Sequence, residues 1–451
     1  MNPRILERSE HPISRRDIDP NVLKVLYRLI GAGHVACIAG GGVRDLMLSR
    51  KPKDFDIATS AHPQQVRELF RNSRLIGRRF RLVHVFFGRQ NIEVATFRRQ
   101  SEEVASSEDP MIRLDNTFGT PEEDAFRRDF TVNALFYDPQ SFRVIDFPGG
   151  VDDLQVRLIR TIGNPELRLR EDPVRMMRAV RFAAKLGFEI EPATRAAIER
   201  HRGDLAKASV PRLVEETYRT VAQPEAARAI VLMEELGLLE AVLPFLSEHL
   251  KGCGIPLSGQ PAVRNMAALG RRIADGYAPE HAIVLAALML DLWRAAAGSG
   301  RTDLMAALRS RGFARGDTER MRLILDAFEL LAAPSRRTRR LMRRPYFGEA
   351  QQFFEMLAAS YGIDEAAVHR FLAAPPDGAV LSPVPSGGPQ ILDETPRRRR
   401  RRRRGRRRRR NRGVLALASP SEQIEASVEP DGHRQHRNGA TSPPDSARND
   451  H

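Results

Sequence analysis

The chain has 451 residues, a formal net charge of +16 and a hydrophobic content of 41%, which is ordinary for a globular protein. This length exceeds one compact core and predicts several domains. No run of eighteen apolar residues occurs, the charged N-terminus lacks the apolar core of a secretion signal, and the two cysteines are far apart. These features argue against a membrane span, a secreted chain and a cysteine-built zinc site, and they favour the cytoplasm.

The segment up to about residue 147 reads as a small mixed sheet flanked by helices. A helix is predicted over 19–31, where Asp19 and Pro20 suit the start and Gly31 suits the end. A second, short helix is predicted directly after the glycines at 40–42, and a third over 63–72. Strands are predicted over 35–39 and 54–59, and a hairpin over 81–98 with its turn at 88–91.

From about residue 150 to 371 the pattern is helical and shows no strand. The clearest helix covers 171–188, where Asp172 is expected to cap the start, Pro173 to occupy the first turn and Gly187 to end it. Residues 372–396 are rich in Pro and Gly and read as a linker.

The positive charge is concentrated near the end of the chain. Residues 397–412 contain 14 arginines and no acid, so the rest of the chain, with +16 less 14, carries only +2. Residues 397–451 cannot bury a core and are expected to be disordered. The natural partner of the arginine run is a polyanion, with an anionic lipid surface as a second target, and the alternative is a tail that only aids solubility.

Two aspartates stand one residue apart in the strand predicted at 54–59. On a strand, Asp54 and Asp56 share a face and Phe55 points the other way, toward a core. Two carboxylates on one face repel each other unless a cation lies between them, and hard oxygen ligands favour magnesium or manganese. The alternative is a solvent-exposed strand end.

Three glycines, 40–42, separate a predicted strand from a helix, where backbone N–H groups can meet a phosphate. The segment is neither a Walker loop, since no Gly-Lys-Ser/Thr follows, nor a dinucleotide fingerprint, since Asp45 stands in place of the third glycine. A tight turn would also explain the glycines. Arg44 could bind a triphosphate or could pair with Asp45.

A third carboxylate would complete such a metal site, and spacing leaves two candidates. Glu93 lies on a strand that could neighbour the Asp54 strand, and Asp129 lies beside Arg127 and Arg128.

In the helix at 171–188, Asp172 and Arg175 could present an acceptor and a donor to a nucleobase. The alternative is an ion pair between Arg175 and Glu171, which are four residues apart.

These motifs occur in an order that resembles the class II nucleotidyltransferases, the family of tRNA CCA-adding enzymes and bacterial poly(A) polymerases. The segments are GGGVRDLMLSRKPKDFDIAT at 40–59, RRDFTVNAL at 127–135, and the stretch 146–188 that ends in EDPVRMMRAVRFAAKLGF. The resemblance covers residues 14–245. Within the family, segments 71–88 and 162–188 are similar to the poly(A) polymerase branch.

The resemblance implies an α+β protein with a polymerase β-like nucleotidyltransferase head at 14–148, a helical neck that recognises the base at 149–215 and a helical, RNA-binding body at 216–371. It implies that Asp54 and Asp56 hold catalytic magnesium, and it ranks Asp129 above Glu93 as the third catalytic carboxylate. The residues that it implies in ATP binding are Gly41, Gly42, Arg44, Arg128, Asp172, Arg175, Arg178 and Arg181.

The implied activity is template-independent transfer of adenylate from ATP to RNA 3′ ends, in mRNA processing and RNA turnover, with RNA-degradation machinery as a further partner. The alternatives are a CCA-adding enzyme, which would also use CTP, and a non-catalytic RNA-binding protein. Many CCA-adding relatives carry a His-Asp phosphohydrolase domain. Here Leu290 precedes Asp291, so no such second activity is expected.

Removal of residues 391–451 is expected to weaken RNA binding and its dependence on salt. Each arginine–phosphate contact releases counterions, with a slope of about −0.7 per contact on single strands. Turnover at saturating RNA should stay nearly intact. Affinity measurements over a salt series check this, and an unchanged affinity at low salt would contradict it.

Overall fold

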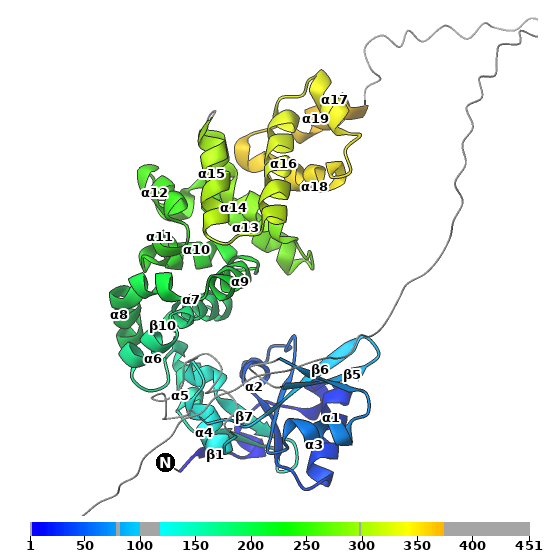
Figure 1. Cartoon of the computed structure of the whole chain (residues 1–451), viewed down its shortest axis with the longest axis vertical. Helices are drawn as coiled ribbons and strands as arrows, with labels where there is room; N and C mark the ends of the chain where they lie inside the picture. The colour runs from blue at the N-terminus through cyan, green and yellow to red at the C-terminus, as the bar shows by residue number, and fades with distance from the viewer. Residues whose placement is uncertain (1, 78–81, 100–117, 297–298, 374–451) are drawn as a thin grey trace, which may run out of the picture. The chain divides into compact units, whose positions relative to one another are not determined.

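The computed structural model describes residues 2–77, 82–99, 118–296 and 299–373 (Figure 1). The arginine run at 397–412 and all but the first two residues of the predicted linker lie outside the described residues, and the predictions made for them stay predictions.

An eight-stranded mixed sheet is built from the first 146 residues of the chain, coloured blue to cyan (Figure 1). Its strand order is β1-β8-β7-β2-β3-β6-β5-β4, and β3 and β6 are parallel whereas all other neighbours are antiparallel. The strands are β1 Arg4–Leu6, β2 Ala36–Ala39, β3 Asp56–Thr59, β4 Ser73–Ile76, β5 Leu82–Phe87, β6 Gln90–Thr96, β7 Leu135–Asp138 and β8 Arg143–Asp146.

The predicted sheet of few strands was too small. The sequence pattern predicts β2, β3, β5 and β6, and it misses β1, β4, β7 and β8. The missed strands have only three or four residues, so they offer little alternation, whereas β2 and β3, which are equally short, were predicted from an apolar run and from an alternating segment, respectively. Two of them also depend on distant partners, since β7 pairs with β2 through Ile38 and Tyr137, and β1 pairs with β8 through Ile5 and Ile145.

Within the described residues, five α-helices accompany the sheet. They are α1 Pro20–Gly31, α2 Gly41–Met47, α3 Pro63–Leu69, α4 Pro121–Phe126 and α5 Gly150–Val156. The start of α1 follows its sequence signals, because the Asp19 side chain accepts the N–H of Asn21 at 2.7 Å and Pro20 occupies the first turn. Helix α1 buries Val22, Val25, Leu26 and Leu29 in the hydrophobic core.

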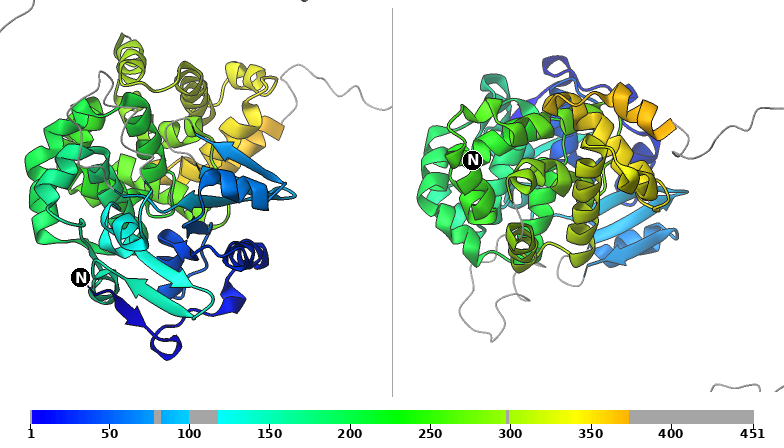
Figure 2. Two further views of the ribbon diagram at one scale, coloured as in Figure 1. Left: turned by 60° about the horizontal axis from the view of Figure 1, so that its bottom comes forward. Right: turned by 90° about the horizontal axis from the view of Figure 1, so that it is seen from above.

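The chain from α6 onward is almost entirely helical, as predicted, and Figure 2 shows these helices in green to orange. Its helices are α6 Pro165–Glu171, α7 Val174–Leu186, α8 Pro192–His201, α9 Val210–Val221, α10 Ala226–Glu235, α11 Leu238–Val242, α12 Pro244–Gly252, α13 Pro261–Ala274, α14 His281–Ala295, α15 Ser299–Ser310, α16 Arg315–Ala332, α17 Arg336–Leu341, α18 Phe347–Leu357 and α19 Glu365–Ala373. Among the described residues, none of the helices combines the length and apolar character needed to cross a bilayer.

The prediction that this region has no strand was wrong. Strands β9 (Leu158–Ile159) and β10 (Glu189–Ile190) form a short parallel pair. Each has two residues, so the sequence offers no period from which either could be recognised.

The helix predicted over 171–188 is two helices. Helix α6 ends at Glu171, Asp172 follows it as the C-cap residue, and α7 begins at Val174. Pro173 causes the break, since proline disfavours the helical conformation of the residue before it. Asp172 therefore does not cap α7 with its side chain as expected. Gly187, with a φ of 73°, ends α7 as predicted.

Close helix packing around α13 leads to a prediction of stability. A Cβ added at Gly270 would lie 2.1 Å from the carbonyl oxygen of Pro224, so Gly270→Ala must push the backbones apart. We expect a loss of about 2 kcal/mol or more. Gly316 of α16 is the matched control, because a Cβ there meets nothing within 4 Å. Gly316→Ala should be neutral or stabilising by up to about 1 kcal/mol. Thermal unfolding midpoints check the pair, and equal midpoints would contradict the packing argument.

Candidate active site

Three carboxylates gather where β3 begins. Asp56 is the first residue of β3, and the parallel register sets it opposite Glu93 of β6. Asp54 lies two residues before the strand, so the strand starts later than predicted. All three carboxylates line one cavity of about 760 Å³. Phe55, between the two aspartates, packs against the hydrophobic core as predicted.

The surroundings of Asp56 change the pKa of its carboxyl group. Its partial withdrawal from water and the charges of Glu93 and Asp54 raise its pKa, and the charge of Arg128 acts in the opposite direction. A cation bound among the carboxylates would relieve this repulsion. The donors are all carboxylate oxygens, which Mg²⁺ and Mn²⁺ prefer, so the residues fit such an ion.

A second cavity, of about 450 Å³, is rich in arginine and shares Asp56 with the first. Gly40, Gly41, Asn133 and Phe182 contribute uncharged walls. Its charged lining residues are Arg44, Arg127, Arg128, Arg175, Arg178, Arg212, Asp56, Asp129 and Asp172. Six arginines thus face three aspartates. The volume lies in the range of small-molecule sites, and the excess of positive charge suits an anionic ligand.

Six of the eight residues predicted to bind nucleotide line this arginine-rich cavity, and two do not. The six are Gly41, Arg44, Arg128, Asp172, Arg175 and Arg178. Gly42 is buried, and a Cβ there would lie 3.3 Å from the ring of Phe55, so its role is to permit packing. Arg181 lines the larger cavity instead.

Gly40, which the sequence analysis did not select, is the glycine with the strictest requirement. Its φ of 74° and ψ of −130° lie in a region that side chains disfavour. A Cβ there would also lie 2.8 Å from Nη1 of Arg128. The glycine therefore lets the Arg128 guanidinium approach the turn before α2.

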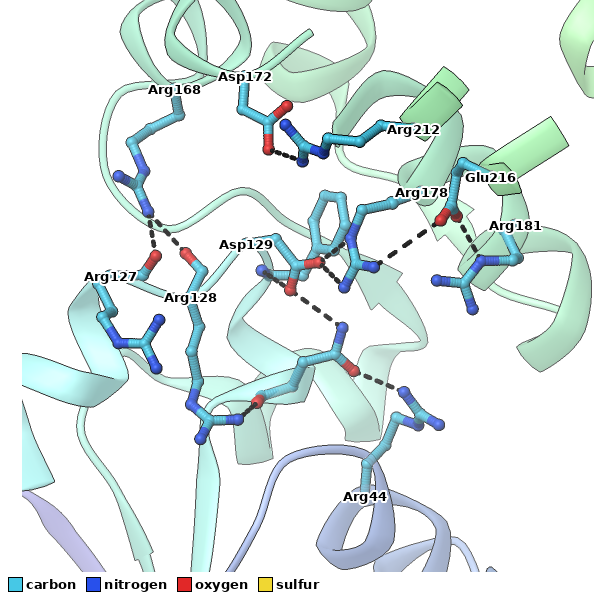
Figure 3. Close-up of polar contacts among 12 residues, drawn as sticks. Arg44, Arg127, Arg128, Asp129, Arg168, Asp172, Arg178, Arg181, Arg212 and Glu216 are labelled. Atoms are coloured by element: carbon cyan, nitrogen blue, oxygen red, sulfur yellow. Dashed lines mark hydrogen bonds and ion pairs between the residues drawn. The ribbon is translucent and has the colours of Figure 1, made fainter. Parts of the chain in front are cut away.

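Arg44 makes the ion pair that the sequence offered as the alternative to phosphate binding. Its Nε and Nη2 lie 2.8 and 2.6 Å from Oδ1 of Asp45. Its Nη1 donates to Oδ1 of Asn133 at 2.5 Å, the dashed line that leaves Arg44 in Figure 3. The side chain is almost fully buried yet lines the cavity. Asp45 therefore orients the guanidinium, which still forms part of the cavity wall.

Both carboxylate oxygens of Asp129 accept hydrogen bonds from neighbouring groups of the protein. Its Oδ2 receives Nε and Nη2 of Arg178 at 2.7 and 2.6 Å, and its Oδ1 receives Nδ2 of Asn133 at 3.2 Å and the N–H of Phe130 at 2.8 Å (Figure 3). Burial raises the pKa of Asp129, but the charge and hydrogen bonds of Arg178 outweigh it and hold the pKa below its ordinary range. Asp129 is an ionised, fully hydrogen-bonded carboxylate that binds α7.

Asp172 and Arg175 both line the cavity, and both have protein partners. Oδ2 of Asp172 accepts Nη2 of Arg212, on α9, at 2.8 Å. Nη1 of Arg175 donates to the carbonyl of Arg168 at 2.8 Å and lies 3.3 Å from Glu171, the pairing that the spacing offered as the alternative. Each side chain is thereby held at the cavity wall.

Sequence reasoning missed Asp124, which orients two of the arginines. Its buried carboxylate lies 2.7 Å from Arg127 and 2.8 Å from Arg128. Burial raises the pKa of Asp124, but Arg128 and Arg127 outweigh this and lower it. A signal was present, since residues three and four apart meet on a helix.

No helical spacing in the sequence pointed to three further residues at the site, which are Arg168, Arg212 and Glu216. Arg168 donates to the carbonyls of Arg127 and Arg128 at 2.7 and 2.8 Å (Figure 3). Oε1 of Glu216, on α9, accepts Nε of Arg181 at 2.5 Å. These partners lie 35 or more residues apart, so only the tertiary structure brings them together.

Asp291, at the position examined for a His-Asp pair, has a histidine partner from another helix. Its Oδ2 lies 2.7 Å from Nε2 of His249 on α12, while Leu290 is buried in α14. The expectation about a second activity stays a prediction.

Known families match two parts of this chain. The family described as "Poly A polymerase head domain" matches residues 36–160, and that described as "Probable RNA and SrmB- binding site of polymerase A" matches residues 187–250. The "Poly(A) polymerase I" of Salmonella typhi is 50% identical over 252 residues, which is 54% of each chain. That of Haemophilus influenzae is 39% identical over 60% of this chain and 62% of its own length. The chain therefore spans about half to three fifths of the length of these relatives.

CCA-adding enzymes are also similar. That of Bacillus velezensis is 39% identical over 53% of this chain and 60% of its own length. The crystal structure of the Bacillus stearothermophilus CCA-adding enzyme in complex with CTP is 31% identical, with a TM-score of 0.59 over 79% of this chain and 82% of that one. The mixed sheet, the following helices and these matches agree, and the chain belongs to the nucleotidyltransferase family that contains bacterial poly(A) polymerases and CCA-adding enzymes.

Proposed function

We propose that this protein is a template-independent poly(A) polymerase, which transfers adenylate from ATP to the 3′-hydroxyl of RNA and releases pyrophosphate. The observation that carries the proposal is the shared wall of the two cavities. Asp56 lines the arginine-rich cavity and also the cavity of Asp54 and Glu93. A nucleotide held among the arginines would have its phosphates beside the carboxylates, which is the arrangement that phosphoryl transfer with bound metal requires.

Asp54, Asp56 and Glu93 would hold the divalent cation, magnesium or manganese. A metal bound there lowers the pKa of an attacking hydroxyl and stabilises charge on a leaving phosphate. We assign Glu93 as the third ligand and give Asp129 a different role. Glu93 stands opposite Asp56 in the sheet register, whereas the oxygens of Asp129 are occupied by Arg178, Asn133 and Phe130. Asp129 would act by holding Arg178 at the cavity.

The arginines would position the triphosphate and hold its charge. Arg44 and Arg128 line the cavity beside Gly41 at the start of α2, and both are already oriented by carboxylates. Arg127 and Arg178 add positive charge to the same wall. Preorganised guanidinium groups of this kind stabilise developing negative charge without having to reorganise during the reaction.

Asp172 and Arg175 would read the base. Because Arg212 occupies Oδ2 of Asp172, the other oxygen is left to accept a hydrogen bond from an amino group such as that of adenine. Protein side chains would then select the nucleotide without a template strand. The 50% identity to the poly(A) polymerase of Salmonella typhi, against 39% to the CCA-adding enzyme of Bacillus velezensis, supports ATP as the nucleotide.

RNA as the acceptor is supported by the match of residues 187–250 to a probable RNA-binding site. Roles in mRNA processing and RNA turnover, an association with RNA-degradation machinery and a cytoplasmic location are further parts of this proposal, and they rest on the resemblance to the family.

Nucleotide choice is the first test of the function. We expect the full-length chain with ATP to extend a generic RNA by many residues, and CTP alone to give little incorporation. A tRNA that lacks its CCA end serves as the second acceptor. Incorporation of CTP on this tRNA, with no long tail from ATP, would identify a CCA-adding enzyme instead. No incorporation on either acceptor would favour the non-catalytic RNA-binding alternative.

Substitution of the carboxylates tests the metal assignment. We expect Asp56→Asn and Glu93→Gln each to weaken Mn²⁺ binding in the presence of ATP by more than about tenfold, because each removes a ligand. Incorporation of adenylate into RNA by these two variants should fall as their Mn²⁺ affinity falls. Asp129→Asn should leave Mn²⁺ affinity nearly unchanged and lower the unfolding midpoint, because it weakens the buried pair with Arg178.

Electron paramagnetic resonance of free Mn²⁺ measures the affinity apart from activity. A normal Mn²⁺ affinity of the Glu93→Gln variant, with a large loss in the Asp129→Asn variant, would restore Asp129 as the third ligand. RNA affinity is the control, since none of these substitutions should change it.

A further inference from the structure

A strongly basic surface lies on α17 and the turn that follows it, outside both cavities. Residues 330–348 contain six arginines and no acid. Five of these arginines are exposed. They are Arg336, Arg337, Arg340, Arg343 and Arg344, and we call them the α17 arginine cluster.

The buried side of α17 explains why these side chains face outward. Thr338 and Leu341 are buried, and Oγ1 of Thr338 donates to the carbonyl of Leu330 in α16 at 2.8 Å. Backbone bonds from Arg343 to Arg340 and from Arg344 to Leu341 continue the helical turn. Figure 1 shows α17 beside α16 and α19. The sixth arginine, Arg339, is half-buried with its guanidinium 5.1 Å from the ring of Phe371.

The five side chains of the cluster have no acidic partner within the described part of the chain. Two half-buried arginines of the preceding helix differ in this respect. In α16, Arg320 lies 2.5 Å from Glu349, and Arg322 lies 2.7 Å from Glu319 and 2.8 Å from Asp326. The α17 arginine cluster is therefore a local accumulation of positive charge without ion-pair partners among the described residues.

Such an accumulation costs free energy in the isolated chain. Like charges three and four residues apart on a helix each destabilise it by a few tenths of a kcal/mol. Polyanion phosphates remove that repulsion and release counterions. The arrangement thus points to a ligand with several phosphates in a row rather than to a role in folding.

We propose that the α17 arginine cluster binds the phosphates of an RNA strand at nucleotides other than the reacting 3′ end. The proposal rests on the proposed function, which supplies the RNA. None of the five arginines lines either cavity, and they also lie outside the 187–250 segment that matches an RNA-binding family. The cluster would therefore be an additional contact that holds a longer acceptor. This contact would not depend on the base sequence of the RNA, since phosphates carry no base information.

Side-chain chemistry favours RNA over an anionic membrane as the partner. A helix that lies on a bilayer needs an apolar face directed outward. Here Leu341 is turned inward, and Met342, 41% exposed, is the large apolar side chain that the cluster presents. Arginine forks match phosphate oxygens and also stack on bases, so five guanidinium groups around one exposed thioether suit a single strand.

The test compares two triple variants of the full-length chain that remove the same charge. The cluster variant is Arg336→Gln, Arg340→Gln and Arg343→Gln. The control is Arg309→Gln, Arg322→Gln and Arg370→Gln, whose arginines are partly exposed and paired with acids. Affinity for a long and a short oligoadenylate is measured by fluorescence anisotropy over a salt series. The KM for ATP and the unfolding midpoint are measured for each protein.

We expect the cluster variant to bind the long RNA about tenfold more weakly than the control variant, with a salt slope shallower by about 2, since three contacts are lost. Binding of the short RNA and the KM for ATP should stay unchanged, and the unfolding midpoint should stay the same or rise slightly, because repulsion within the cluster is reduced. Equal affinity and slope in the two variants would overturn the proposal. So would loss of binding to phosphatidylglycerol vesicles with unchanged RNA binding, which would identify a membrane surface.

The binding measurements do not depend on incorporation. If the wild-type chain incorporates no ATP, the proposed function fails while the comparison of the two variants still decides whether the cluster binds RNA.

Discussion

The partly buried ion pair between Asp129 and Arg178 is the interaction on which the arginine-rich cavity depends. Asp129 follows α4 in the sheet-bearing part of the chain, and Arg178 lies on α7 in the helical part. Removing one partner leaves the other charge uncompensated, at a cost below the value of about 3–5 kcal/mol that is typical of a fully buried pair. Arg168 adds a second tie through the carbonyls of Arg127 and Arg128. Together these contacts bring the sheet end and α7 to opposite walls of one cavity.

Charge is separated within the site in a way that suits one reaction. The carboxylates of Asp54, Asp56 and Glu93 stand together, without the arginine pair that neutralises Asp129. The arginines, by contrast, are each held by an acceptor, as Arg44 is by Asp45 and Arg128 is by Asp124. An orienting carboxylate lowers the freedom of a guanidinium but leaves the cavity positive overall. Asp56 belongs to both groups of residues and connects them.

Arginines serve two different purposes in this chain, and their partners distinguish them. Those of the cavity are fixed by specific acceptors, which suits a ligand of defined shape such as a nucleotide. Those of the α17 arginine cluster are exposed and lack acidic partners among the described residues. Such side chains adapt to a flexible polymer whose phosphates recur along the strand, as RNA phosphates do.

Local signals in the sequence were sufficient for many of the elements and for most of the predicted nucleotide-binding residues that line the arginine-rich cavity. Asp19, Pro20 and Gly187 mark helix ends through their own backbone preferences, and the alternation in β3 and β6 predicts strands. The order of the glycines, the paired aspartates and the RRD segment identified the family without any coordinates. The same residue-by-residue reading left Glu93 and Asp129 undecided, because spacing says nothing about which strand lies beside which.

Tertiary structure determined which partner each of these charged groups has. The parallel pairing of β3 with β6 sets Glu93 opposite Asp56, and α7 delivers Arg178 to Asp129 from 49 residues away. Strands β1 and β7 were missed for the same reason, since their hydrogen bonds are made to distant segments. Capping and periodicity act over a few residues, so the sequence by itself determined the longer elements and the chemical groups of the site. Ion pairs and strand register act across the fold, so only the folded chain determined which of these groups meet.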